Sequence, residues 1–171
     1  MDQNDLGLAR YDAGADYLAS LNRLDLSPEA LFWAYDKTIE QFVLVLVTRF
    51  FDYAGPLAVT EALFKAYRAS ATPAEIDPFI IRVHSPEQRV YKELLFALRS
   101  TGTIAAGWTR DDYHRAVLAG EVEQAGVFAF TYADLSGFGA WIYKASEGPR
   151  KLIDVAKPWT RFSSKVQRLA A

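Results

Sequence analysis

Apolar residues recur at helical spacing in three stretches of the chain. Between residues 5 and 22 they fall three and four positions apart, which predicts an amphipathic helix. The same spacing follows Pro56 and also follows Ser85-Pro86, and a proline in the first turn or a serine before it is typical of a helix start. We therefore expect helices over 5–22, from 56 onward and over 85–99. The expected buried faces are Leu8, Tyr11, Ala15, Leu18 and Leu21; Val59, Leu63, Phe64 and Tyr67; and Val90, Tyr91, Leu94, Leu95 and Leu98.

Two stretches between the first and second helices have the composition of strands. Residues 31–35 and 42–48 are rich in aromatic and β-branched side chains, and the polar run 36–38 separates them. Ser27-Pro28 could instead begin a helix, but we favour a β-hairpin. Because the second stretch is apolar on both faces, we expect it to be a central strand covered on both sides.

Further strands are predicted at 79–83, 127–132 and 140–144, the last two joined by a turn-rich segment at 134–139. The order strand, helix, strand, helix between 41 and 99 predicts a parallel pair. We expect an α+β fold: an N-terminal helix, a β-hairpin, a βαβα run and a C-terminal β-hairpin that form a mixed sheet of about five strands, packed with helices around a single core. A short strand at 103–108, a short helix to about residue 118 and a short helix near 163–170 are also expected.

Composition agrees with one folded domain. The 171 residues are 51% hydrophobic and 23% charged, which is far from the signature of disorder. The absence of cysteine excludes disulfides and thiolate chemistry and suits a reducing compartment. The first residues have no basic start or apolar stretch of a signal peptide, and the longest apolar run, 42–47, is too short to span a bilayer. We therefore expect a cytoplasmic protein with no membrane partner.

Charge is distributed unevenly along the chain. Residues 1–149 hold 13 Lys and Arg against 20 Asp and Glu, whereas residues 150–171 hold 6 against 1. The first part has a net charge of −7 and the last part +5, so the overall −2 conceals an acidic domain with a basic end. We divide the chain into a single domain, 1–148, and a basic C-terminal arm, 149–171.

One candidate ligand site lies where the predicted parallel strands end. The carboxyl ends of parallel strands meet at one edge of a sheet, and helix N-termini present N–H groups there. This edge would gather Arg49, Asp52, His84 and Ser85, with Arg49 as the partner of an anion and His84 as a proton donor or acceptor. The alternative is structural: turn and cap roles for Asp52 and Ser85, an ion pair for Arg49 and a backbone hydrogen bond for His84.

Other chemistry has little support in the sequence. Asp111, Asp112 and His114 could share a cation, but acidic residues in a first helical turn also complement the helix dipole. We find no nucleophile elbow, Walker loop or dinucleotide loop, so we predict no catalytic residue, metal site or cofactor.

The basic arm is the candidate surface for a partner. Its cations are interleaved with two aromatic residues, which suits nucleic-acid phosphates and bases. The same composition suits docking on a second subunit and neutralising an acidic surface, and we favour docking because the acidic domain would repel a phosphate backbone. The partner-binding candidates are Arg150, Lys151, Lys157, Trp159, Arg161, Phe162, Lys165 and Arg168.

Three functions follow in order of preference. The first is a small intracellular binding or accessory protein that acts through protein contacts and self-associates, a homodimer being the simplest form. The second is a small-ligand or anion-binding protein, or an enzyme, at the carboxyl end of the parallel strands. The third is nucleic-acid binding through the basic arm.

Overall fold

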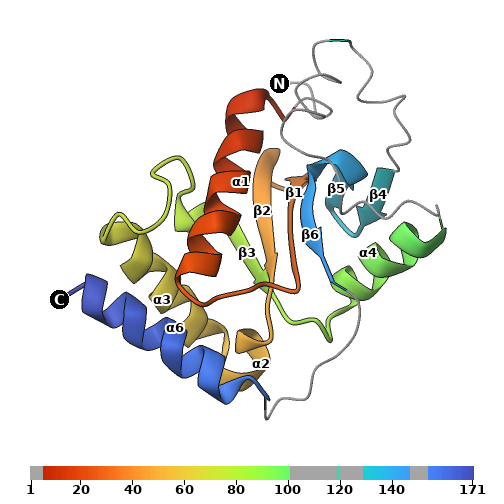
Figure 1. Ribbon diagram of the computed structural model, residues 1–171. Helices are drawn as coiled ribbons and strands as arrows, with labels where there is room; N and C mark the ends of the chain where they lie inside the picture. Colours follow the sequence, from red (N-terminus) through yellow and green to blue (C-terminus); the bar gives the residue numbers. More distant parts are fainter. Residues whose placement is uncertain (1–5, 101–118, 120–128, 147–153) are drawn as a thin grey trace.

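The computed structural model describes residues 6–100, 119, 129–146 and 154–171. In this part of the chain a six-stranded mixed sheet is packed with helices (Figure 1). The strands are β1 Ala30–Asp36, β2 Gln41–Val47, β3 Ile81–His84, β4 Ala129–Tyr132, β5 Leu135–Phe138 and β6 Ile142–Ala145. The helices are α1 Leu8–Arg23, α2 Phe50–Ala54, α3 Pro56–Arg68, α4 Arg89–Ser100 and α6 Ala156–Leu169, with the single 3₁₀ turns η1 Pro78–Ile80 and η2 Gly139–Trp141.

The hairpin of β1 and β2 is the centre of the sheet, and it confirms the predicted strand pair. The two strands are antiparallel from Ala30 opposite Val47 to Asp36 opposite Gln41. Successive side chains of a strand point to opposite faces, and both faces are buried here. One face of β1 carries Leu31, Trp33 and Tyr35 toward α1, α3 and α6, and the other carries the alternate residues toward α4.

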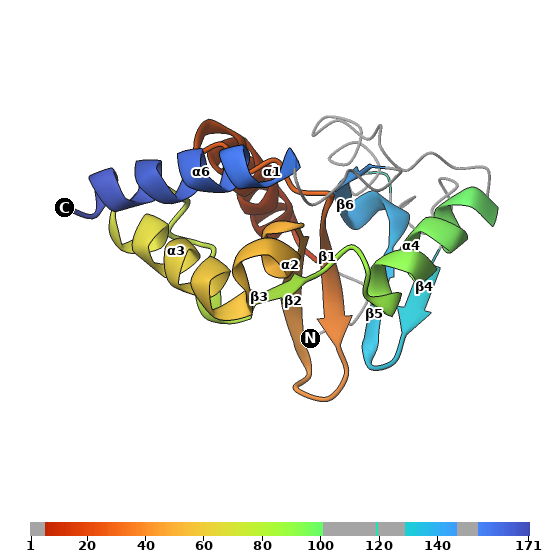
Figure 2. The same ribbon diagram turned by 90° about the horizontal axis from the view of Figure 1, so that it is seen from below.

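The remaining strands extend the sheet on both sides of the hairpin. β3 lies parallel to β2, with Leu44 opposite Ile81 and Val47 opposite His84, as the βαβ pattern predicted. On its other side β1 pairs with β6 near its start and with β5 near its end, and β4 follows β5. Figure 2 shows α6 running alongside α3 and α4 lying toward β4 and β5.

The strand expected at 79–83 begins at Ile81, after η1, and three larger differences from the predictions follow. The helix expected from Ser85 begins at Arg89, because the Ser85 side chain accepts a hydrogen bond from the Glu87 N–H and holds residues 85–88 in a turn. The segment 134–139, expected to be a hairpin connection, contains β5, and β6 pairs with β1 instead of with the strand ending at Tyr132.

The third difference is the end of the chain, where α6 spans 156–169 instead of a short helix near 163–170. Pro158 lies in its first turn, where the missing N–H costs no helical hydrogen bond, so it does not break the helix. The strand expected at 103–108 and the helix expected to about residue 118 lie outside the described residues.

Candidate functional site

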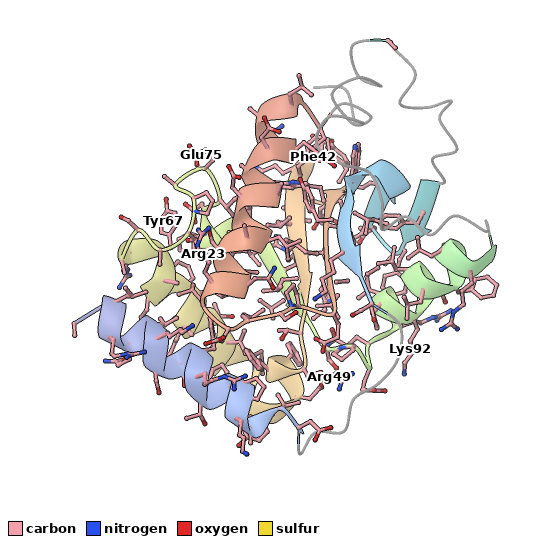
Figure 3. All side chains as sticks on the ribbon, in the orientation of Figure 1. Arg23, Phe42, Arg49, Tyr67, Glu75 and Lys92 are labelled. Atoms are coloured by element: carbon pink, nitrogen blue, oxygen red, sulfur yellow. The ribbon has the colours of Figure 1, made fainter. Side chains whose placement is uncertain are left out.

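The parallel pairing of β2 and β3 sets the geometry of the predicted ligand site. Both strands end at the same edge of the sheet, and the Thr48 N–H donates to the His84 carbonyl oxygen at 2.9 Å just beyond the last pair. Arg49 and Asp52 follow β2, and Ser85 follows β3. The structure therefore brings the backbone of all four predicted residues to one edge, and Figure 3 shows Arg49 there.

The side chain of Arg49 is buried and forms an ion pair with Glu29 of the same chain. Only 7% of it is exposed, and its Nε lies 3.0 Å from Glu29 Oε1. The backbone N–H of Arg49 also donates to Glu29 Oε2 at 3.1 Å. The charge that was expected to attract an anion is thus compensated by a carboxylate, as in the structural alternative.

Glu29 is the residue of this edge that the sequence interpretation missed. The hairpin register contains the missing signal: Ala30 lies opposite Val47, so the residue before β1 lies beside the residues that follow β2. Burial raises the pKa of Glu29 above its ordinary value, although the N–H and guanidinium of Arg49 both lower it. The effect of desolvation on the pKa of Glu29 is therefore larger than the effect of the ion pair.

Asp52, His84 and Ser85 form a separate group of hydrogen bonds. The Ser85 hydroxyl donates to Asp52 Oδ2 at 2.8 Å, and the Ser85 N–H donates to the side-chain oxygen of Gln88 at 3.2 Å. His84 Nδ1 lies 2.7 Å from the same Gln88 oxygen. Burial is the largest effect and lowers the pKa of His84, the Gln88 hydrogen bond raises it, and the charge of Arg82 lowers it. These contacts fasten the turn between β3 and α4 to the start of α2.

A cavity of about 240 Å³ opens beside Arg49 rather than beside His84. Glu29, Thr48, Arg49 and Phe50 line it, together with residues of α6 and of the loop after α1. Asp52, His84 and Ser85 are not among its lining residues. The remaining lining residues are Asn22, Asp25, Ser27, Asp154, Val155, Pro158 and Arg161.

The part of the basic arm that the structure describes is a helix docked on the domain. Phe162 and Val166 of α6 are buried in the same cluster as α1 and α3, and Phe162 stacks on Phe50 with ring centroids 5.6 Å apart. The Trp159 ring packs edge-on against Phe50 at 5.3 Å. The aromatic residues proposed to dock on a partner therefore contact the chain's own core.

The basic residues of the arm are placed differently from its aromatic residues. Lys157, Arg161 and Arg168 are exposed. Lys165 Nζ lies 2.6 Å from Asp25 Oδ2, and this hydrogen bond lowers the pKa of Asp25. Lys165 Nζ also donates to the Arg23 carbonyl oxygen at 3.0 Å. The predicted contact residues Arg150 and Lys151 lie outside the described residues.

An apolar surface that the sequence interpretation did not identify lies on the outer side of α3. Leu57 is 71% exposed and Phe79 of η1 is 76% exposed. The ring of Phe79 contacts that of Phe64 edge-on, with centroids 4.9 Å apart. We call this the α3 surface, and it consists of Leu57, Glu61, Phe64 and Arg68 of α3 together with Phe79.

Among the described residues, no three His, Asp or Glu side chains gather as a metal site would require. Asp111, Asp112 and His114 lie outside those residues. The helices that can be described are all too short or too polar to cross a bilayer. Comparison with protein-family models, curated protein sequences and solved structures finds no match to the chain. The functional argument therefore depends on the geometry of the chain itself.

Proposed function

We propose that the protein acts through protein contacts and self-associates through the α3 surface. The observation that supports this proposal most is the exposure of Leu57 and Phe79, 71% and 76%, on neighbouring elements. Large apolar side chains exposed on neighbouring elements of a folded domain are typical of a contact surface. The Phe64–Phe79 contact restricts the second ring, which reduces the side-chain entropy that docking would lose.

The charges of the α3 surface suit a second copy of the same chain. Leu57, Glu61, Phe64 and Arg68 are spaced by four, three and four residues, so they form one stripe along α3. If two copies of α3 pack antiparallel around a two-fold axis, Glu61 of each copy faces Arg68 of the other. Phe64 of each copy, with Phe79 packed on it, would then lie between two ion pairs, and Leu57 would lie beyond them, opposite the segment that follows α3 in the other copy.

Sedimentation velocity of the full chain at micromolar concentrations tests this proposal. We expect a dimer that Leu57→Asp and Phe79→Asp each convert to a monomer, because a buried, unpaired carboxylate is costly. Ile39→Asp is the matched control, since Ile39 is also exposed, at 42%, but lies in the turn between β1 and β2. A wild-type chain that is monomeric at these concentrations would refute self-association.

A charge exchange tests the arrangement of the two helices. Glu61→Arg and Arg68→Glu should each weaken the dimer, because they place like charges opposite each other. The double variant should regain affinity, because it restores opposite charges with reversed positions. Failure of the double variant to recover would contradict the antiparallel packing while leaving the apolar contact in place.

The cavity beside Glu29 and Arg49 favours a second candidate function, the binding of a small zwitterionic molecule. Its volume of about 240 Å³ is below the range of drug-sized sites. Asp154 and Arg161 offer opposite charges among its lining residues, and Phe50, Val155 and Pro158 offer apolar contact. A ligand with an amine and a carboxylate on a short apolar body fits this composition.

Thermal unfolding in the presence of each of the twenty amino acids tests the second candidate. A ligand that binds the folded chain alone raises its Tm. We expect at least one amino acid to do so, and Arg161→Ala to abolish the shift, whereas the exposed Arg89→Ala should leave it unchanged. No shift with any of the twenty would exclude free amino acids as ligands of this cavity.

A further inference from the structure

The exposed side of α6 has an unusual composition. Its residues recur at the spacing of one helical face, three of them are cationic and the other three are neutral hydrogen-bonding residues. The sequence of α6 contains no Asp or Glu. We call this the α6 face, and it consists of Lys157, Thr160, Arg161, Ser164, Gln167 and Arg168.

Helix stability explains only part of this charge. Arg168 lies in the last turn, where a cation interacts favourably with the helix dipole. Lys157 lies in the first turn, where the dipole disfavours a cation, and no acidic residue accompanies it there. The helix dipole therefore does not account for the cation at the start of α6.

The opposite side of α6 fixes the cations in a line. Phe162 and Val166 are fully buried in the core, so the helix cannot rotate about its axis without exposing them. Lys157 and Arg168 are eleven residues apart, which corresponds to about 16 Å along the helix. Along that length duplex DNA carries about ten phosphates, one for each ~1.7 Å.

Surface hollows flank the α6 face near both ends. One, of about 350 Å³, is lined by Ala156, Lys157, Thr160 and Arg161. The other, of about 610 Å³, has Arg23 of α1 among its lining residues, together with Lys165 and Arg168 of α6. Lys165 is paired with Asp25, and Arg23 is exposed beside Lys165 and Arg168.

We infer that the α6 face binds the phosphate backbone of a nucleic acid. Lysine, arginine, serine, threonine and glutamine are the side chains that contact phosphates. The core of a protein interface is instead poor in charge and rich in large apolar side chains, and the α6 face has none. Phe162 and Val166 on the apolar side of α6 are already buried, so they cannot enter a lipid surface. Asp25 and Asp154 line the same cavity as Arg161 and oppose binding there, whereas acidic charges farther away than about 8 Å are largely screened at physiological salt.

Fluorescence anisotropy with labelled single-stranded and duplex DNA and RNA of one length tests the inference. The variant Lys157→Glu/Arg161→Glu/Arg168→Glu should bind at least about tenfold more weakly than the wild type at low salt. The plot of log K against log salt should also become shallower by about two to three, because each lost phosphate contact removes about 0.7–0.9 from the slope.

The control variant carries the same change in net charge on another part of the molecule. Lys37, Arg89 and Lys92 are exposed, and Lys92 lies on α4, away from α6 (Figure 3). Lys37→Glu/Arg89→Glu/Lys92→Glu should keep most of the affinity, and the Tm of both variants should confirm that they are folded. An equal loss in both variants would mean that net charge alone is responsible and would overturn the inference. Salt-insensitive or absent binding, or equally tight binding of poly-glutamate, would overturn it as well.

Discussion

At the scale of single residues, the buried ion pair of Glu29 and Arg49 leads to a prediction about stability. Arg49→Ala leaves a carboxylate that is 14% exposed without its guanidinium partner. We expect a loss of about 3–5 kcal/mol in the free energy of unfolding at neutral pH, the usual result of breaking a buried ion pair. Urea denaturation measures it. The control is Arg89→Ala, which breaks the exposed pair with Glu93 and should cost less than about 0.5 kcal/mol.

The pH dependence of the same variant identifies the cause of the loss. Without the guanidinium, the pKa of Glu29, already raised by burial, should rise further. A raised folded-state pKa favours the folded protein at low pH, where Glu29 is protonated, and this advantage is lost as the pH rises through that pKa. Arg49→Ala should therefore cost less at pH 5 than at pH 7. A loss that is the same at both would mean that packing, not charge, is responsible.

His84 should make the stability of the fold depend on pH in the opposite direction to Glu29. Because burial lowers the pKa of His84, the unfolded chain takes up a proton at a higher pH than the folded chain does. The contribution of His84 to the free energy of unfolding should be constant above the ordinary value of 6.5 and fall as the pH drops below it. His84→Gln should remove this slope. An NMR titration that places the pKa of His84 at or above 6.5 would contradict the prediction.

These residues also mark the limit of what the sequence predicts. The proximity of Asp52 to Ser85 followed from the parallel strands, because turn residues at strand ends meet wherever the strands do. The partner of Arg49 could not be found by composition, since several acidic residues lie near both strands in sequence. Only the register of the hairpin selects Glu29.

The elements themselves show the same contrast. The hairpin of β1 and β2 was predictable because its β-branched and aromatic runs have no competing period. β5 was missed because Ser136 and Gly137 are typical turn residues, yet Gly137 is buried close to the ring of Phe130 and the strand pairs along its length. Pairing with neighbouring strands thus overrides the local preference.

Gly14 of α1 leads to a prediction about how two elements approach each other. A Cβ at this position would overlap the ring of Tyr143 on β6, whose hydroxyl accepts from Trp33 Nε1 and donates to the Tyr11 carbonyl oxygen. In an exposed helix, Gly14→Ala would raise the free energy of unfolding by about 1 kcal/mol. Here we expect overpacking to lower it by a net amount of about 1–3 kcal/mol. In a Tyr143→Leu background the same change should be neutral or stabilising. A stabilised Gly14→Ala single variant would disprove the close contact.

At the scale of the whole molecule, the docked α6 changes the meaning of the charge asymmetry. An acidic domain and a free basic arm would move independently, and the arm's aromatic residues would be available to partners. The structure instead uses Phe162 and Val166 to complete the core on one face of the sheet, and it leaves the cations of α6 outside. One side of α6 therefore packs in the core, and the other side is the proposed phosphate-binding surface.

Truncation after Gly148 tests whether residues 1–148 form a stable domain without this helix. The cut removes two fully buried side chains, Phe162 and Val166, each of which contributes about 1.5–3 kcal/mol by burial. Since a domain of this size is stable by only about 5–15 kcal/mol, we expect a markedly lower urea midpoint and exposure of Phe50 to solvent. Truncation after Gln167 removes only exposed residues and should leave the midpoint nearly unchanged. If the two truncated chains unfold at the same urea concentration as the full chain, residues 149–171 are a separable arm, and the cations of α6 are not held in line by the core.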